Sequence, residues 1–513
     1  MDQQKPVTKP NSGDAEGRAR IGNRRYRLIE MLPGVLIWTS FILAVVLSFT
    51  APMVAIYYII VFDLLWLFRV CYFVLHLFSS LRRYRRAIRT DWQAKLDALP
   101  RQRELYHVIF LPTYKEGIEV IRATMRSLVE AKYAYKKERF VVVYAGEERE
   151  GQAFLDRAAQ IEKEFGDQFF KLLITVHPKD LPDEIAGKSA NINWAGHRVQ
   201  EYFDSIGVAY ENVAVSSFDV DTCVHPQYFA CLAYLYLTHP NPTRTSFQPI
   251  ALYNNNMWDS AAPVRVAAFG TTFWLMTELA RPERLFTFSS HSMSLHALVD
   301  VGFWQKDIVS EDSRIFLQCL VKYDGDYVVT PIYVPVSMDT VTSDTWRGSL
   351  ANLYKQQRRW AWGVENLPYL VSRFMYNPNF PLRKKIFFTY TIMEGMYTWA
   401  TAPIIIFILG YVPFWFAPEQ LHAAVLFQNA PHTLEWLMRL SMVGVFISAF
   451  ASLTLLPPRP AHKKAHDVLI MLAQWVLVPV TFIAFGSFPA IDAQTRMMLG
   501  KYMGFNVTAK KRS

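Results

Sequence analysis

The chain has 513 residues, of which 52% are hydrophobic and 19% are charged. This composition argues against a purely soluble protein, because the apolar residues gather near the two ends while the middle resembles a globular domain. The formal net charge is +10. The basic residues lie beside the apolar runs rather than along one helix or stripe, so the charge fits anionic lipid headgroups and does not indicate nucleic-acid binding.

The N-terminal region predicts a membrane hairpin. Residues 1–30 are expected to be a polar cytosolic tail, disordered at its start and without a cleaved signal peptide. Two apolar runs, 33–50 and 53–78, approach the length that crosses hydrocarbon and define a transmembrane hairpin over residues 31–80. Asp63 lies inside the second run and is expected to face the helix bundle. Arginines flank the hairpin on both sides, which predicts that both flanks are cytosolic.

The middle of the chain, residues 90–380, predicts a cytosolic α/β domain. Short β-branched or aromatic runs alternate with amphipathic stretches, which favours a mostly parallel sheet. The predicted strands are Tyr106–Leu111, Phe140–Tyr144, Lys171–His177 and Val213–Phe218, and the predicted helices include Gly117–Lys132 and Gln152–Phe165. Ligands of such sheets bind beyond the carboxyl ends of the strands, so we expect the site there.

Apolar runs resume in a C-terminal transmembrane region over residues 385–490, at roughly 386–416, 436–456 and 467–488. The basic loop 457–466 and the basic tail 491–513 both read as cytosolic. One simple span cannot join two cytosolic segments. Either 467–488 is re-entrant around Pro479 or lies on the membrane surface, or the tail is outside, and we expect the first of these because of the tail motif described below. The four cysteines form no CxxC pair, and we expect free thiols and no zinc site.

Two acidic motifs are candidates for chemistry. Asp219-Val220-Asp221 follows a predicted strand, where two carboxylates can share a hard cation; the alternative is a solvated loop. Ser310-Glu311-Asp312 precedes a predicted helix. Either Ser310 or Asp312 is an N-cap, or a carboxylate here is a general base.

Three further motifs could bind phosphate or nucleotide. Gln356-Gln357-Arg358-Arg359-Trp360 could anchor at headgroups, or Arg359 could grip phosphate while Trp360 stacks on a sugar. Gly187–Asn193 resembles the end of a Walker A motif, but its earlier glycine is missing, so we exclude a P-loop. Lys188 then either neutralises phosphate or is an exposed lysine. Pro112–Glu116 opens a loop after the first strand, which suits a nucleotide contact.

The five motifs occur in an order, and between apolar runs, that resembles the arrangement in processive family 2 glycosyltransferases. Cellulose, chitin and hyaluronan synthases are members of that family. The resemblance covers roughly residues 100–365 and the membrane plan. The tail adds Phe505–Lys510, which looks like the FxVTxK gating loop of cellulose synthases. The implied fold is a GT-A-like α/β glycosyltransferase domain between transmembrane helices.

The resemblance implies a role for each matching residue. Asp219 would contact the nucleotide, and Asp221, with Asp219, would bind Mg²⁺ or Mn²⁺. Asp312, in the motif with Glu311, would be the catalytic base. The residues implied in substrate binding are Thr113, Glu116, Glu147, Lys188, Gln356, Arg359, Trp360 and, in the gating loop, Thr508 and Lys510. The family usually has Asp after the second strand, where it contacts the nucleobase. This chain has Glu147-Glu148 there, so the resemblance does not fix which nucleobase is bound.

The implied activity is inverting transfer of a sugar from a nucleotide sugar, taken as a UDP-sugar, to a growing polysaccharide at the cell membrane. Product translocation and export partners would belong to that activity. One alternative is transfer of a single sugar to a lipid carrier or glycolipid. An alternative of another class is a non-catalytic subunit of an export complex that binds nucleotide or polysaccharide.

Overall fold

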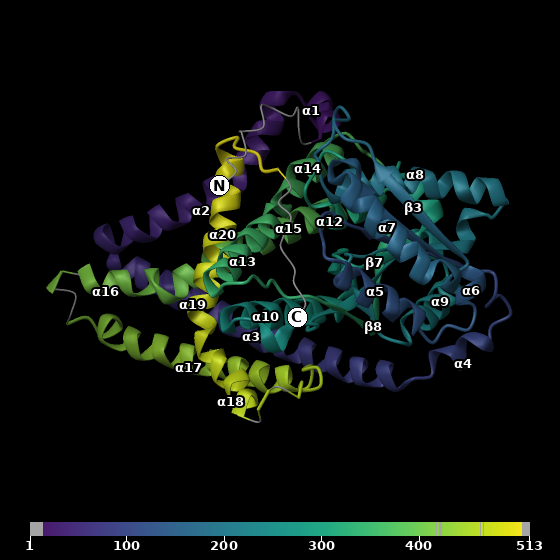
Figure 1. The fold of residues 1–513 in the computed structure, drawn as a ribbon. Helices are drawn as coiled ribbons and strands as arrows, with labels where there is room; N and C mark the ends of the chain where they lie inside the picture. The colour runs from purple at the N-terminus through teal and green to yellow at the C-terminus, as the bar shows by residue number, and fades with distance from the viewer. Residues whose placement is uncertain (1–13, 417, 420–422, 462, 465, 505–513) are drawn as a thin grey trace.

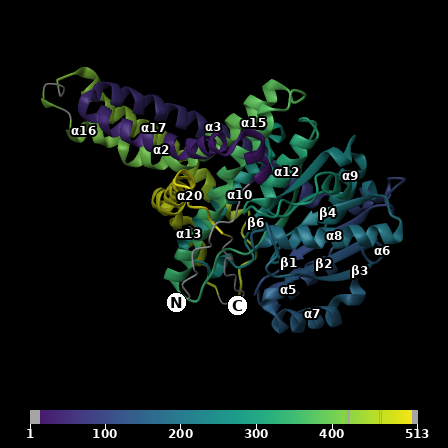
Figure 2. The ribbon, with the colours of Figure 1, turned by 90° about the horizontal axis from the view of Figure 1, so that it is seen from above.

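The computed structural model describes residues 14–416, 418–419, 423–461, 463–464 and 466–504. It has two parts, a bundle of long apolar helices and an α/β domain built on one mixed sheet, which lie side by side in Figure 1 and Figure 2. The predicted fold class is confirmed, since a mostly parallel α/β domain stands between long apolar helices in the chain.

Two long antiparallel helices, α2 (Asn23–Thr50) and α3 (Pro52–Arg89), form the predicted hairpin. Ala51 breaks the helix and Pro52 opens the next one, since proline fits the first helical turn but cannot continue the preceding helix. Asp63 is 7% exposed, as expected for a carboxylate that faces the bundle. The part of the expected N-terminal tail that the structure describes is helical: α1 (Ala15–Ile21) is followed by Gly22 and then by α2.

The sheet has eight strands in the order β3-β2-β1-β4-β7-β6-β8-β5. The first four strands are parallel to one another, β7 is antiparallel to both of its neighbours, and β6 pairs with β8 in parallel. The strands are β1 (Tyr106–Pro112), β2 (Phe140–Glu147), β3 (Lys171–His177), β4 (Val213–Ser217), β5 (Cys223–Val224), β6 (Thr245–Tyr253), β7 (His291–Ser294) and β8 (Val328–Met338). Chain order reverses between β1 and β4, so a ligand crevice is expected at their carboxyl ends.

Amphipathic helices cover the sheet. In α5 the apolar residues Val120, Ile121, Met125 and Leu128 recur at helical spacing and are buried. The helices of this domain are α4 (Trp92–Asp97), α5 (Ile118–Val129), α6 (Lys136–Arg139), α7 (Gln152–Phe165), α8 (Lys188–Ile206), α9 (Tyr228–Thr238), α10 (Ala262–Leu279), α11 (Leu295–Asp300), α12 (Glu311–Lys322), α13 (Trp346–Ala361) and α14 (Asn366–Met375).

The C-terminal region continues the bundle. It contains α15 (Leu382–Phe407), α16 (Val412–Phe416), α17 (Val425–Leu453), α18 (His466–Ala473), α19 (Val478–Phe482) and α20 (Phe488–Met498). Within the described residues, four helical segments are long and apolar enough to cross a membrane, α2, α3, α17 and His466–Met498, and a fifth would be the pair Leu382–Phe407 and Leu409–Phe416. That pair bends by 43°.

The segment His466–Met498 differs from its prediction. The expected re-entrant bend at Pro479 is not seen in this described segment, because Pro479 lies in the first turn of α19, where a proline is tolerated. The segment runs across the hairpin and α17 in Figure 1, and α20 is seen nearly end-on in Figure 2. Both its ends contact the α/β domain, through Arg265 to Gln474 at 2.6 Å and Arg358 to Asp492 at 2.8 Å. These contacts join the segment to α10 and α13 of the α/β domain.

A small apolar cluster joins the two parts of the molecule. Ile37 of α2, Trp362 beyond α13, Ala400 of α15 and Ala490 of α20 pack together with Val309, which precedes α12. Four distant stretches of chain thereby meet directly behind the Ser310-Glu311-Asp312 motif.

Candidate functional site

The carboxyl ends of β1 and β4 and the start of α12 bring the main acidic residues together. Asp219 and Asp221 follow β4, while Glu311 and Asp312 form the first turn of α12. Lys188, the first residue of α8, lies between them: its Nζ is 2.9 Å from Asp219 Oδ1, 3.0 Å from Asp312 Oδ1 and 3.3 Å from Glu311 Oε1. Two motifs and the lysine predicted from separate parts of the sequence therefore share one centre.

The Gly187–Asn193 segment positions this lysine. Ser189 Oγ donates to Ile308 O at 3.0 Å, Asn191 Nδ2 donates to Ala145 O at 3.0 Å, and Asn193 Nδ2 donates to Trp304 O at 2.7 Å. These bonds fix the start of α8 against the end of β2 and the loop before α12. The Lys188 side chain is 10% exposed, so the prediction of an exposed lysine is wrong.

The charges of this centre shift its pKa values. Burial lowers the pKa of Lys188, but Asp219, Asp312 and Glu311 outweigh burial and raise it well above its ordinary value. Burial, reinforced by Asp312, raises the pKa of Glu311, while Lys188 acts against this shift. An ammonium group held this strongly stays protonated and screens the carboxylates from one another.

Asp221 is held by the end of β8. Its Oδ2 accepts from Asp339 N at 2.8 Å, and its backbone oxygen accepts from Asn255 Nδ2 at 3.1 Å. Asp219 and Asp221 present carboxylate oxygens, the donors that Mg²⁺ and Mn²⁺ prefer, beside a centre that carries more acidic than basic groups. The donor chemistry therefore fits a divalent cation. Among the described residues, no group of three or more His, Cys, Asp and Glu side chains is arranged to hold a metal ion.

The Gln356–Trp360 motif lies on α13. Gln356 is buried, and the Trp360 ring lies 5.9 Å from the Tyr253 ring at the end of β6. The charge of Arg359 lowers the pKa values of Tyr253 and Glu311 against the effect of burial, which places it near the acidic centre. Arg358 instead forms an ion pair with Asp492 of α20. The two neighbouring arginines therefore differ in their surroundings.

The predicted nucleotide-binding loops form a second group at the ends of β1 and β2. Thr113 Oγ1 donates to Glu116 Oε2 at 2.8 Å, which closes the loop after β1. Glu147 is buried at the end of β2 and pairs with Arg149, whose guanidinium lies 4.7 Å from the centre of the Tyr114 ring. Burial raises the pKa of Glu147, and Arg149 opposes that shift. Thr508 and Lys510 of the predicted gating loop lie outside the described residues.

Several residues near these groups were not predicted. His291 of β7 lies with Nδ1 3.8 Å from Asp312 Oδ1, and Thr287 Oγ1 donates to Asp312 O at 2.6 Å. His177, next to Glu147 in the sheet register, lies 3.0 Å from Glu184. These contacts join residues that are distant in sequence, and no local sequence motif marks them.

The mixed sheet, with the carboxylate centre beyond the carboxyl ends of β1 and β4, is a GT-A-like arrangement. Residues 215–485 match the glycosyl transferase family group 2. This match spans more than half of the chain, and the protein belongs to that family.

Similar solved structures include a mannosyltransferase and S. aureus TarS. The mannosyltransferase PcManGT from Pyrobaculum calidifontis, in complex with GDP-Man and Mn²⁺, is 13% identical, with a TM-score of 0.43 over 86% of this chain and 100% of that one. S. aureus TarS 1–349 with UDP-GlcNAc is 12% identical, with a TM-score of 0.30 over 69% of this chain and 93% of that one. Both likenesses are too distant to assign a donor or a metal to this chain. No curated protein matches the sequence.

Proposed function

We propose that this protein catalyses inverting transfer of a sugar from a UDP-sugar to a growing polysaccharide at the membrane. One observation carries the proposal: Lys188 bonds Asp219 and Asp312, which are 31 and 124 residues away in the chain. This contact brings Asp219, the proposed nucleotide and metal ligand, close to Asp312, the proposed base. An inverting transfer needs both within reach of one sugar.

In this proposal Asp312 is the catalytic base. It takes the proton of the acceptor hydroxyl as that oxygen forms a bond to the anomeric carbon of the sugar, and the bond from that carbon to the nucleoside diphosphate breaks. Glu311 lies beside it, and burial, reinforced by Asp312, raises the pKa of Glu311.

The substrate-binding roles follow from position. Asp219 contacts the nucleotide, and Asp221 with Asp219 would hold Mg²⁺ or Mn²⁺. When bound, such a cation neutralises the charge of the diphosphate leaving group. Lys188 and Arg359 add positive charge for the same diphosphate, while Gln356 and Trp360 bind the acceptor end. Thr113, Glu116 and Glu147 form the nucleotide side, and Thr508 and Lys510 close over it.

The membrane setting supports a polymer acceptor. In Figure 2 the bundle that contains α2, α3, α15 and α17 projects from one side of the α/β domain, and in this proposal the acceptor chain passes from the site toward that bundle. The small number of spans keeps one alternative open, addition of a single sugar to a lipid carrier. A non-catalytic binding subunit is less favoured, because Asp219, Asp221, Glu311 and Asp312 are all present.

The test is a panel of radiolabelled UDP- and GDP-sugars with Mn²⁺ and the purified protein. A UDP-sugar should give a membrane- or polymer-bound product, and chelation with EDTA should abolish it. Asp312→Asn should lose at least about 10²-fold in kcat, since general base catalysis contributes that much; unchanged activity would show that the base is wrongly assigned. A ladder or high polymer supports the polysaccharide acceptor, and one lipid-linked sugar supports the alternative.

A further inference from the structure

Glu365 organises the backbone in front of α12. One of its carboxylate oxygens, Oε1, accepts from Ser310 Oγ at 2.6 Å, from Ser310 N at 3.0 Å and from Val309 N at 3.2 Å. Charged acceptors make shorter and stronger hydrogen bonds than neutral ones. A residue about 55 positions away in the chain thus fixes the turn that precedes Glu311 and Asp312.

This turn lacks the usual cap of its own. Ser310 occupies the N-cap position of α12, but its side chain makes no capping bond to the helix. The prediction that Ser310 caps the helix through its side chain is therefore wrong. Its hydroxyl points to Glu365 instead, so the orientation of the first turn depends on a residue outside the helix.

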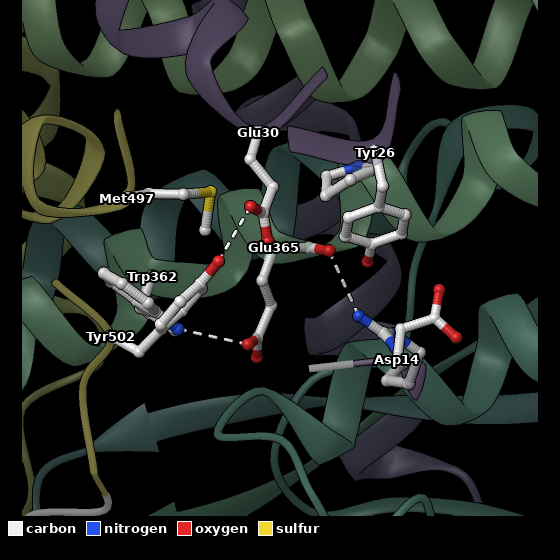
Figure 3. A pocket seen from close by; sticks show the side chains of 9 residues that line it. Asp14, Tyr26, Glu30, Trp362, Glu365, Met497 and Tyr502 are labelled. Carbon is white, nitrogen blue, oxygen red and sulfur yellow. Dashed lines mark hydrogen bonds between the residues drawn. The ribbon is translucent and has the colours of Figure 1, made fainter. Parts of the chain in front are cut away.

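Glu365 also belongs to the structure around α13. It ends the short 3₁₀ helix Trp362–Glu365 that directly follows α13, and its Oε2 accepts from Trp362 Nε1 at 3.1 Å (Figure 3). Arg314 of α12 donates to the backbone oxygen of Glu365 at 3.2 Å. One residue therefore connects α12, which carries Asp312, to the end of the helix that carries Arg359 and Trp360.

Glu365 does not belong to the reacting centre. It lines a separate cavity of about 20 Å³ with Asp14, Tyr26, Glu30 and Tyr502, where Tyr502 bonds Glu30 (Figure 3). Within the described residues, the Glu365 carboxylate accepts hydrogen bonds from Val309, Ser310 and Trp362 and not from Lys188. Any effect on the reaction must therefore act through the residues it holds.

We propose that Glu365 is a positioning residue that sets Asp312 relative to Arg359 and Trp360, a role that depends on the proposed function of Asp312 as base. A displacement of about 1 Å in a catalytic group can cost about 10²-fold in rate. Loss of Glu365 should thus lower kcat and leave the KM for the donor sugar nearly unchanged, because the predicted nucleotide contacts at β1 and β2 stay in place.

The test compares kcat and KM of purified full-length variants with the donor identified by the panel. Glu365→Ala should lose about 10- to 100-fold in kcat, with donor KM within about threefold. Glu278→Ala is the matched control, because Glu278 is a buried carboxylate of α10 that pairs with Arg281 and Arg284 away from the site. The control should lower the melting temperature without lowering kcat.

Three further variants keep the test decisive if Glu365→Ala does not fold. Ser310→Ala removes only the hydroxyl bond and should give a smaller loss of kcat. Glu365→Gln keeps one side-chain oxygen that can accept from Ser310. Its amide NH₂ group, however, would face the indole N–H of Trp362, and two donors cannot bond each other. Adding Trp362→Phe removes the indole N–H and with it this conflict. Partial recovery of kcat in Glu365→Gln/Trp362→Phe over Glu365→Gln supports the positioning role, and no recovery contradicts it.

Asp312→Asn, measured in parallel, separates the two proposals. Full activity of Asp312→Asn overturns the base assignment, and with it the role of Glu365. If Asp312→Asn is inactive while folded Glu365→Ala keeps the parent kcat, only the positioning role is overturned.

Discussion

At the residue scale, the ammonium group of Lys188 explains how three carboxylates can lie close together. Asp219, Glu311 and Asp312 each lie within 3.3 Å of its Nζ. Carboxylates this close repel one another, and removal of one partner of a buried ion pair leaves uncompensated charge. The lysine therefore has a structural role as well as the proposed role in binding the donor diphosphate.

The first prediction concerns Lys188→Met. The variant should lose about 10²-fold in sugar transfer, the typical effect of removing one preorganised donor, and should also melt at a lower temperature. Transfer is measured with the radiolabelled donor, and unfolding by a thermal scan in detergent. Lys179→Met is the control, because Lys179 is exposed and should keep both properties. A stable Lys188→Met with full activity would exclude both roles.

The second prediction uses two neighbouring arginines of α13. Arg359→Ala should reduce sugar transfer, because its charge lies near the acidic centre. Arg358→Ala should mainly weaken the packing of α13 on α20, by about 1–2 kcal/mol for a lost charged hydrogen bond, and Asp492→Asn should do the same. Kinetics and thermal unfolding of the three variants are compared. If Arg358→Ala and Arg359→Ala lost sugar transfer equally, the different roles proposed for the two arginines would be contradicted.

Part of the candidate site could be predicted from the sequence. Asp219, Asp221, Glu311 and Asp312 lie in short motifs at strand or helix ends, which local patterns reveal. The joint contact of Asp219, Glu311 and Asp312 with Lys188 could not be predicted, because it depends on the fold of a long stretch of chain. Glu365 was missed for the same reason: a lone glutamate after an aromatic motif has no local signature.

At the element scale, α1 is attached to the α/β domain by charge. Arg373 of α14 bonds Asp14 at 2.7 Å and Glu16 at 3.0 Å. Asp14 is buried, whereas the Glu16 side chain is 62% exposed. Of these two ion pairs, only Arg373–Asp14 is sheltered from water. It should therefore contribute most of the free energy that holds α1 against α14.

The third prediction compares these two acids. Asp14→Ala should destabilise the protein by about 2 kcal/mol, the usual range for a charged hydrogen bond, and Glu16→Ala should have little effect. Thermal unfolding in detergent measures both. Similar melting temperatures for Asp14→Ala and the parent would mean that α1 is not held through Arg373.

Prediction of the elements succeeded where the pattern was local. The first four strands, α5 and α7 were found because their apolar residues repeat at strand or helix spacing. The antiparallel β7, His291-Ser292-Met293-Ser294, was missed, because four mostly polar residues do not resemble a strand. It is stabilised by its neighbours β4 and β6, and includes Ser292, whose hydroxyl bonds Ser216 at 2.8 Å.

At the scale of the whole molecule, the segment His466–Met498 determines the side on which the tail lies. Phe49, near the turn of the hairpin, packs against Phe416, with ring centres 4.8 Å apart. The pair α15–α16 thus reaches the far end of the bundle, and α17 returns to the α/β domain, where Trp258 Nε1 donates to Pro457 O. If His466–Met498 lies along the membrane surface, four segments cross, and the tail is on the side of the α/β domain.

The fourth prediction tests this arrangement. A single cysteine introduced at Thr508 in a cysteine-free background should be labelled by an impermeant thiol reagent only after the cells are opened. A cysteine at Gly151, in a loop of the α/β domain, should behave in the same way and is the matched control. Labelling at position 508 in intact cells would mean that His466–Met498 crosses the membrane, and would exclude the proposed gating loop.

The apolar cluster behind the Ser310-Glu311-Asp312 motif has a consequence for dissecting the protein. Hydropathy suggests that residues 90–380 could be cut out and studied alone. Ile37, Ala400 and Ala490, however, come from outside that range and cover Trp362 and Val309. An excised fragment would expose this surface to water beside Glu365, so the α/β domain is not a separable module, and its activity should be measured only in the intact chain.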